Sequence, residues 1–486
     1  MDEKTHKITA SYKENLHYLK TELAVDESFD LICLELFHGE KNMALFLVDG
    51  FGKDAAITEI QKQLRYLDKE KLRDHHVEDY LSQQVIPYIE LSSTDDLNQV
   101  VDEVLSGPCA LLVEGMSNVI LMDTREYPVR SPEEPDTEQV IRGSKDGFVE
   151  TIIMNAALIR RRIRDRTLRV KYVKVGRRSK SDLAIVYIED IAASDYVDHI
   201  YSALQHIRTD GLPMADKTIE EFVFGQHLNP YPLVRYTERP DVSATHLYEG
   251  HLIILVDGSP SAVITPTSFW HHLQHAEEYR QKPIIGAALR LVRFAAVWSS
   301  LFLLPLWYLL ATHSSNLPEA ISFIGSEKPG EIPLFIQFLV AETGIEMLRM
   351  ASIHTPSALA TALGLVAALL IGEVAIEVGL FSPEVVLYLS MAAIGSFATP
   401  SYELSLANRL FRVFFLLCSA LFGISGYIIS VTLWLLLLTR TTVLNVPYLW
   451  PFIPFNYRSM RDVLLRAPMP LKNRRPPALH PKDPDR

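Results

Sequence analysis

Four apolar runs after residue 290 constrain the fold of this 486-residue chain more than any other feature. A helix that crosses a bilayer needs about 20 consecutive apolar residues. The runs over 294–311, 357–380, 384–399 and 413–438 reach or approach that length, although the second contains two acidic residues. The sequence therefore predicts an α-helical, multi-pass membrane domain over 283–440.

A fifth apolar stretch, 333–351, contains Glu342, Glu346 and Arg349. We interpret it as an amphipathic or re-entrant helix, because counting it as a crossing would place one basic flank of the domain outside. With four crossings, the basic residues before the first span and after the last lie on the cytoplasmic side, as do both termini. Arg409 and Arg412 precede the last span and favour five crossings instead, so this alternative stays open.

Charge is distributed in blocks along the chain. Residues 1–140 hold 29 acidic and 13 basic side chains, 141–180 hold 13 basic and 3 acidic ones, and the tail from residue 440 holds nine basic and three acidic ones. The acidic net charge of -12 argues against nucleic acid as a partner. The three cysteines lie in apolar runs without a CxxC pair, which argues against a disulfide framework or a redox motif.

The first 280 residues contain an internal repeat. Residues 44–50 (Ala-Leu-Phe-Leu-Val-Asp-Gly) resemble 184–190, and 105–123 resemble 248–266, at offsets of about 140 residues. These matches predict two related α/β lobes. The predicted organisation is an acidic lobe over 1–140 with a linker from about 127, a second lobe over 141–282, the membrane domain over 283–440 and a basic cytoplasmic tail over 441–486.

Each of the two matched regions contains an acidic residue followed by glycine between two apolar strands, Glu114-Gly115 and Asp257-Gly258. The carboxylates could contact a metal or a ligand. The favoured interpretation is structural: the carboxylate accepts backbone N–H groups at a hairpin turn, and the glycine supplies a positive φ.

Motifs of the common enzyme classes are absent from the sequence: there is no GxxxxGK[ST], GxGxxG after a strand, HExxH or GxSxG. We therefore predict neither an enzyme nor a cofactor. His271, His272 and His275 have a spacing that can bind zinc, but neither a general-base glutamate nor a further ligand accompanies them. A solvated helix face is the favoured interpretation, and no metal is predicted.

A basic run over 158–180 follows the acidic lobe. Attraction to that lobe predicts a contact between lobes or between neighbouring subunits, with anionic lipid as the second candidate. The predicted contact residues are Arg160, Arg161, Arg162 and Arg164.

The second span has two distinct faces on a helical wheel. One face consists of small residues and suits close helix packing, and the other face carries both glutamates. Glu373 lies ~7 Å from the middle of the span at 1.5 Å per residue, where a carboxylate needs a partner, a proton or water. We favour a polar lumen over a hydrogen bond within the subunit. The predicted packing face is Gly364, Ala368, Gly372, Ala375 and Gly379, and the predicted pore-lining face is Ala362, Val366, Leu370, Glu373 and Glu377.

Short motifs along nearly the whole chain carry a family resemblance. In order, spacing and position relative to the spans, the sequence resembles the A-subunit family of spore germinant receptors. The residues concerned are Gly-Phe-Val-Glu (147–150), Asn155, 158–163, 184–189, Thr-Glu-Arg-Pro (237–240), 254–258, Ile-Gly-Glu (371–373), Phe-Ala-Thr-Pro (397–400), 402–404, 451–454 and 465–468.

The resemblance implies a multi-pass protein of the spore inner membrane whose N-terminal lobes face the spore core. It further implies a homo-oligomer, pentameric in that family, that conducts cations when germination begins, alongside other germination proteins of the same membrane and its lipid. Glu373 would then line the conducting path. The alternative is a non-conducting membrane scaffold that couples germination complexes through its lobes.

Overall fold

The computed structural model describes residues 6–73, 77–86, 90–125, 138, 140–313, 331–354 and 373–486. The chain forms two compact units. The first consists of Met1–Gln226, Val234–Pro266 and Pro470–Arg486, and the second of His227–Leu233 and Thr267–Met469. The last 17 residues therefore belong to the same unit as the N-terminal lobes, although they follow the apolar helices in the sequence.

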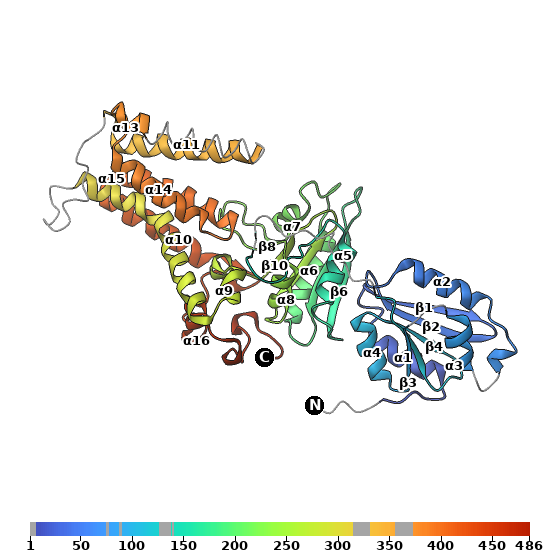
Figure 1. The fold of residues 1–486 in the computed structure, drawn as a ribbon. Coiled ribbons are helices and arrows are strands. Elements are labelled where there is room, and N and C mark those ends of the chain that lie inside the picture. Colours follow the sequence, from blue (N-terminus) through green and yellow to red (C-terminus); the bar gives the residue numbers. More distant parts are fainter. Residues whose placement is uncertain are drawn as a thin grey trace. The chain divides into compact units, whose positions relative to one another are not determined.

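The first lobe is built on a five-stranded antiparallel sheet with strand order β1-β2-β4-β5-β3 (Figure 1). Both faces of this sheet are buried. Alternate residues of β2 belong to two apolar clusters, Ala44 and Phe46 to one, Met43 and Leu45 to the other. The strands are β1 (Leu31–His38), β2 (Lys41–Val48), β3 (Leu91–Thr94), β4 (Cys109–Val113) and β5 (Val119–Met122).

Helices cover the two faces of the first sheet. On one face lie α1 (Tyr12–Glu22) and α4 (Leu97–Ser106), and on the other lies α2 (Asp54–Arg65) (Figure 1). The helices start where the sequence supplies caps: the side chains of Ser11 and Asp96 accept backbone N–H groups of α1 and α4. The short elements η1 (Lys71–Arg73), α3 (Val77–Tyr80) and η2 (Leu81–Val85) complete the described part of this lobe.

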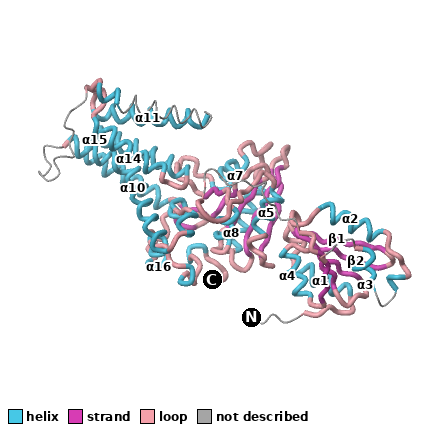
Figure 2. Tube along the Cα trace, viewed as in Figure 1, coloured by secondary structure: helices cyan, strands magenta, loops and turns pink. Residues whose placement is uncertain are grey.

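The second lobe repeats the first. Its strand order, β6-β7-β9-β10-β8, is that of the first sheet, and the two groups of strands are seen in Figure 2. The predicted α/β region of two related lobes is thus confirmed. Its elements are α5 (Ile152–Arg160), β6 (Leu168–Val175), β7 (Ser181–Ile188), α6 (Ser194–His206), α7 (Ala215–Phe224), β8 (Arg235–Thr237), α8 (Pro240–Leu247), β9 (Leu252–Val256) and β10 (Ala262–Thr265).

The two acidic turns have the favoured structural role. Glu114 accepts the N–H of Asn42 at 3.0 Å, and Asp257 accepts that of Ile152, at the start of α5, at 3.1 Å. The glycines that follow have φ of +79° and +85°, a region that disfavours other residues. These carboxylates therefore hold their own lobes together.

The second unit consists mainly of helices. They are α9 (Ala276–Arg280), α10 (Pro283–Thr312), α11 (Leu334–His354), α13 (Ala375–Glu377), α14 (Pro383–Phe397), α15 (Tyr402–Arg440) and α16 (Tyr457–Leu464), with η3 (Phe269–Leu273) and a small ladder of β11 (Thr442–Val443) and β12 (Val446–Pro447). Within the described residues, two helices, α10 and α15, are long and apolar enough to cross a membrane, and α14 is a shorter apolar helix.

Helices α10 and α14 pack closely because one position between them has no side chain. A Cβ on Gly395 of α14 would collide with the carbonyl oxygen of Ala296 in α10. Around this contact, buried residues of α10, α11, α14 and α15 form one apolar cluster that includes Leu304, Phe338 and Leu389. The apolar helices therefore form a packed bundle within the unit.

Helix α15 is not a single straight helix. Gly423 has φ +63° and ψ -143°, so two helices meet there at a kink. The Phe415 ring lies 6.2 Å from the Trp434 ring, whereas 19 residues of continuous helix would separate them by about 28 Å. The segments 402–422 and 424–440 therefore run antiparallel as a helical hairpin.

The apolar runs and the helices agree in part. The runs predicted at 294–311 and 384–399 lie largely in α10 and α14, and the stretch 333–351 lies in α11. The run at 413–438 lies in α15, but it is not one straight helix, because Gly423 interrupts the helix in the middle of that run. The predicted span 357–380 lies outside the described residues up to residue 372.

The hairpin predicts a sharp difference between two neighbouring substitutions. Gly426→Ala should lower the free energy of unfolding by about 1–3 kcal/mol, because its Cβ would collide with the backbone oxygen of Cys418 and cannot rotate away. Ser425→Ala is the matched control, since Ser425 is exposed. Unfolding of the detergent-purified protein measures both, and equal stabilities would contradict the close contact.

A distance measurement tests the hairpin itself. Spin labels at the exposed residues Leu410 and Leu435 should be much closer than the about 38 Å that 25 residues of continuous helix would give. A distance near that value would show that α15 is straight.

Candidate functional site: buried ion pairs between the apolar helices

Arg412, in the first half of α15, is a buried charge at the centre of the second unit. Its guanidinium forms a two-pronged ion pair with Glu342 of α11, at 2.5 and 2.9 Å. It also donates to the carbonyl oxygen of Ser300 in α10 at 2.7 Å and lies 3.4 Å from the hydroxyl of Ser396 in α14. One side chain of α15 therefore contacts three other helices.

Small residues make room for this guanidinium. Ser300 and Ser396 face it, and their hydroxyls donate back to carbonyl oxygens of their own helices, Val297 at 2.8 Å and Ala392 at 3.1 Å. The apolar surroundings thus contain satisfied polar groups. The arrangement needs the close approach of α10 and α14 that Gly395 permits.

A second charge cluster lies one turn further along α11. Glu346 pairs with Arg409 of α15 and with Arg349 of its own helix, and Arg349 donates to the hydroxyl of Tyr402 at 2.6 Å. The Glu346 side chain is 31% exposed, whereas that of Glu342 is 6% exposed. The charge network therefore runs from the interior of the bundle toward its surface.

These contacts change the interpretation of both charged stretches. The acidic residues of 333–351 were expected on the polar face of an amphipathic helix, but Glu342 is buried against α15. The position of Arg412 before the last predicted span favours five crossings, but the positive-inside rule does not apply to an arginine that is paired inside a bundle. Glu342 and Glu346 are four residues apart and Arg409 and Arg412 three apart, so the spacing in the sequence is compatible with two pairs between two helices.

The glutamates predicted to line a pore differ from Glu342 and Glu346. Glu373 and Glu377 are both exposed, and α13 ends at Glu377. Gly379, predicted on the packing face, has φ +75°, and a Cβ there would meet no described atom within 4 Å. Ala375 is half-buried. The remaining predicted positions, Ala362, Gly364, Val366, Ala368, Leu370 and Gly372, lie outside the described residues, so both faces stay predictions.

The basic run places one arginine between the lobes of the first unit. Arg160 is fully buried and donates to Asp30 of the first lobe at 2.8 and 3.2 Å. Arg162 pairs instead with Asp146 at 2.6 Å, Arg161 is half-buried and Arg164 is exposed. The backbone of β6 joins the same contact, because Val170 donates to the Ser28 hydroxyl and accepts the N–H of Phe29.

The three histidines near residue 272 do not form a solvated helix face. His271 lies in η3 and accepts the N–H of Ser268 at 3.0 Å, while His275 caps α9 by accepting that of Glu277 at 3.2 Å. His272 is only 2% exposed. The predicted solvated face is therefore wrong, because a 3-10 helix and an extended residue replace the continuous helix it assumed.

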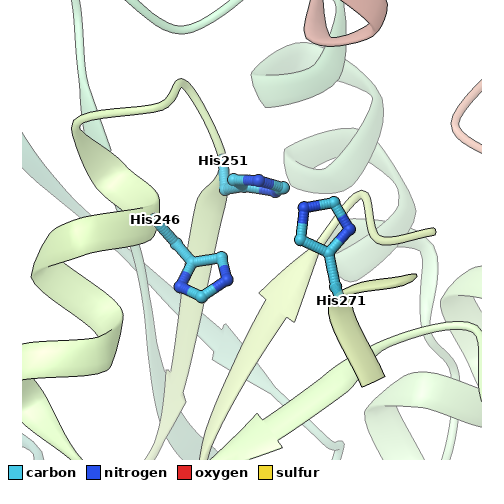
Figure 3. A group of neighbouring side chains, drawn as sticks. All are labelled: His246, His251 and His271. Carbon is cyan, nitrogen blue, oxygen red and sulfur yellow. The ribbon is translucent and has the colours of Figure 1, made fainter. Parts of the chain in front are cut away.

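A histidine pair in the second lobe was missed by sequence reasoning. His246, at the end of α8, and His251, just before β9, have ring centroids 5.0 Å apart and are buried (Figure 3). Their Nδ1 atoms are within hydrogen-bond distance of the carbonyl oxygens of Val242 and Pro266. Burial lowers the pKa of His246 to about 3 and that of His251 to about 4, with smaller contributions from nearby Arg235. His271, also drawn in Figure 3, belongs to the second unit.

Comparison with known proteins decides the family. Residues 17–478 match the Bacillus/Clostridium GerA spore germination protein family. The chain belongs to the GerA family.

Two individual relatives agree with this assignment. The chain is 48% identical over 470 residues to stage V sporulation protein AF of Bacillus subtilis, which covers 97% of this chain and 95% of the relative. It is 31% identical to spore germination protein GerLA of Bacillus cereus, over 90% and 89% of the two chains. The N-terminal domain of the A subunit of the Bacillus megaterium spore germinant receptor GerK3 covers 55% of this chain and 98% of its own, with 26% identity and a TM-score of 0.44. The chain thus belongs to a family of spore germination proteins. Two of its described helices are long and apolar enough to cross a membrane.

The buried pair predicts a non-additive response to mutation. Glu342→Leu and Arg412→Met should each lower the free energy of unfolding by about 3–5 kcal/mol, because each leaves one charge of the pair buried without its counter-charge. The double variant Glu342→Leu with Arg412→Met should recover most of that loss, since it removes both charges. Unfolding in a denaturing detergent titration measures the cycle.

Glu403→Gln is the matched control for that cycle, because Glu403 lies at the start of α15 and accepts from the Ser401 hydroxyl. It should change stability little. Additive single and double variants at residues 342 and 412 would contradict a coupled pair.

The histidine pair predicts a dependence of stability on pH. In the unfolded chain histidine has a pKa of about 6.5, above the folded values of about 4 for His251 and about 3 for His246. As the pH falls, these histidines are therefore protonated in the unfolded chain before they are protonated in the folded one, and protonation favours unfolding. Stability of the second lobe is complete above about pH 6.5 and falls as pH drops toward about 4, by roughly 1.4 kcal/mol per pH unit for each histidine. Urea unfolding between pH 7 and 5 should show a shallower slope for His251→Gln, and an unchanged slope would contradict a buried neutral ring.

Proposed function

We propose that this protein is a membrane subunit of a spore germination complex and forms a homo-oligomeric, cation-conducting channel that promotes ion release during germination. Family membership supports the biological setting. The main observation in support of ion conduction is a difference in environment between the glutamates of the second unit. Glu342 and Glu346 are paired with arginines, whereas Glu373 and Glu377 are exposed next to an apolar segment. Exposed carboxylates there can attract cations.

An exposed apolar face supports assembly into an oligomer. On α14, Leu387, Met391, Ile394 and Phe397 lie on one side of the helix, and each is 47–72% exposed. Such a face needs lipid or another subunit to cover it. In the proposed oligomer, helices of neighbouring subunits and membrane lipid together cover this face of α14.

The connectivity supports a common side for both termini. Residues 470–486 fold with the N-terminal lobes in the first unit, and in this proposal the chain between them crosses the membrane an even number of times. The two halves of α15 are about 31 and 25 Å long, close to the ~30 Å of a bilayer core, and in this proposal they cross it as a pair. Both termini then lie on the core side of the spore inner membrane, next to other germination proteins.

Ion flux tests the proposal. The purified protein in liposomes should pass cations, and Glu373→Gln should lower the conductance or the preference for cations, since it removes a charge from each subunit's contribution to the path. Glu403→Gln, whose carboxylate already accepts a hydrogen bond at a helix start, is the control. Unchanged conductance and selectivity would remove Glu373 from the path.

Absence of flux from folded wild-type protein would favour the alternative, a scaffold that couples germination complexes through its lobes. In that case charge reversal at Arg161 and Arg162 should disrupt assembly, while substitutions of Glu373 and Glu377 should leave germination intact. Arg162 also pairs with Asp146 of its own lobe, so Asp146→Asn is the control that separates loss of that pair from loss of assembly.

A further inference from the structure

A short part of the chain between two elements of the second lobe belongs to the helical second unit. It is the segment 227–233, which lies between α7, ending at Phe224, and β8, beginning at Arg235. Gln226 before it and Val234 after it belong to the first unit, so the chain enters the second unit and returns within seven residues. We call residues 227–233 the inserted segment.

Tyr231 of the inserted segment joins the two halves of α15. Its hydroxyl donates to the side-chain oxygen of Asn408 at 3.0 Å and accepts the indole N–H of Trp434 at 2.6 Å. Asn408 precedes Gly423 and Trp434 follows it, and 26 residues of continuous helix would separate them by about 39 Å. One oxygen atom therefore bridges the two antiparallel segments of the hairpin.

The bridge is buried, and the hydroxyl has both a donor and an acceptor. Tyr231, Asn408 and Trp434 are each at most 3% exposed, so a phenol that lost these partners there would be unfavourable. The ring of Tyr231 also stacks on that of Phe411, with centroids 5.5 Å apart. Apolar packing and two hydrogen bonds thus hold Tyr231 in place together.

Asn229 attaches the inserted segment to the end of α15. Its side-chain amide donates to the hydroxyl of Thr441, the residue that follows α15, at 2.9 Å. Its side-chain oxygen accepts the backbone N–H of Tyr231 at 3.1 Å, which makes a local turn. The segment therefore contacts the first half of the hairpin, the second half and its end.

The connections of the inserted segment to α7 and to β8 differ in their freedom to move. On the α7 side, residues 226–228 are exposed. On the β8 side, only residues 232–234 separate Tyr231 from the strand, all three are buried, and the carbonyl oxygen of Leu233 accepts the hydroxyl of Thr267 at 2.9 Å. Four residue steps reach at most about 14 Å, so a displacement of β8 is passed to Tyr231, whereas the exposed side can absorb one.

We propose that the inserted segment is a clasp that couples the second lobe to the helical hairpin. With Tyr231 in place, the two halves of α15 are held together. Displacement of β8, the edge strand of the second sheet, withdraws Tyr231, breaks both hydrogen bonds and lets the halves separate. A change in the second lobe thereby reaches the apolar helices through a continuous piece of chain. This coupling does not depend on whether the protein conducts ions.

Spin-label distances in the full-length protein in detergent micelles test the clasp. With labels at the exposed residues Leu410 and Leu435, the wild type should give a narrow distance distribution. Tyr231→Ala should broaden the distribution and shift it to longer distances, and Tyr231→Phe should do so less, because the ring packing remains while the hydroxyl is lost. Tyr427→Phe is the matched control, since Tyr427 lies in the same half of α15 as Trp434. It should leave the distribution unchanged.

A second experiment tests the coupling. Val263→Ala removes a buried side chain from β10 opposite Tyr236 of β8, and should make the amide hydrogens of a β8 peptide exchange several-fold faster. The label distribution should broaden in the same variant. Two glycines inserted after Leu233 should cancel that broadening, because they let β8 move without Tyr231. Two glycines inserted after His227, in the exposed connection, should not cancel it.

Three results would overturn the proposal. Unchanged distances in Tyr231→Ala would show that Tyr231 does not hold the halves of α15 together. Equal effects of Tyr231→Phe and Tyr427→Phe would show that the bridging hydroxyl contributes nothing, and these two variants decide the question if Tyr231→Ala does not fold. Faster exchange of β8 in Val263→Ala without any broadening would show that the lobe and the hairpin are independent.

Discussion

The buried guanidinium of Arg412 is the constraint on which the second unit depends. A charge in apolar surroundings is tolerated only when its donors are satisfied, and here Glu342, Ser300 and Ser396 supply the acceptors from three other helices. This requirement fixes the relative rotation of the helices, because a small turn of any of them would remove a partner. The small side chains that let α10 and α14 approach then follow as a consequence of the same constraint.

The first unit uses the same device between its lobes. Arg160 and Asp30 are both buried, and Ser28 ties the pair to the backbone of β6. A buried pair of this kind contributes little net stability compared with apolar packing, but it penalises every arrangement in which one charge loses its partner. Each pair therefore serves mainly to select one arrangement of the elements that it joins. The pairs Arg160–Asp30 and Arg412–Glu342 thus specify how the two lobes and the apolar helices are arranged, which apolar packing alone would define less sharply.

The sequence predicted what local patterns determine. Apolar runs located α10 and α14, and the repeat of 44–50 at 184–190 predicted two related lobes, whose sheets have the same strand order in the structure. The hairpin at Gly423 was not predictable in this way, because a glycine inside an apolar run is compatible with a straight helix until tertiary contacts reverse the chain. The pairing of Glu342 with Arg412 and the meeting of His246 with His251 depend on packing, and the favoured solvated face for His272 failed for the same reason.

Polar contacts hold the C-terminal end of the chain in the first unit. Lys482 donates its backbone N–H to the carbonyl oxygen of Ile191 and its ammonium to that of Glu189, both at 2.9 Å. Lys472 pairs with Glu249 at 2.5 Å, and Leu479 is the one buried side chain among residues 473–486. These residues therefore depend more on hydrogen bonds and charge pairs than on buried apolar surface, in contrast to the apolar clusters that hold each face of the first sheet.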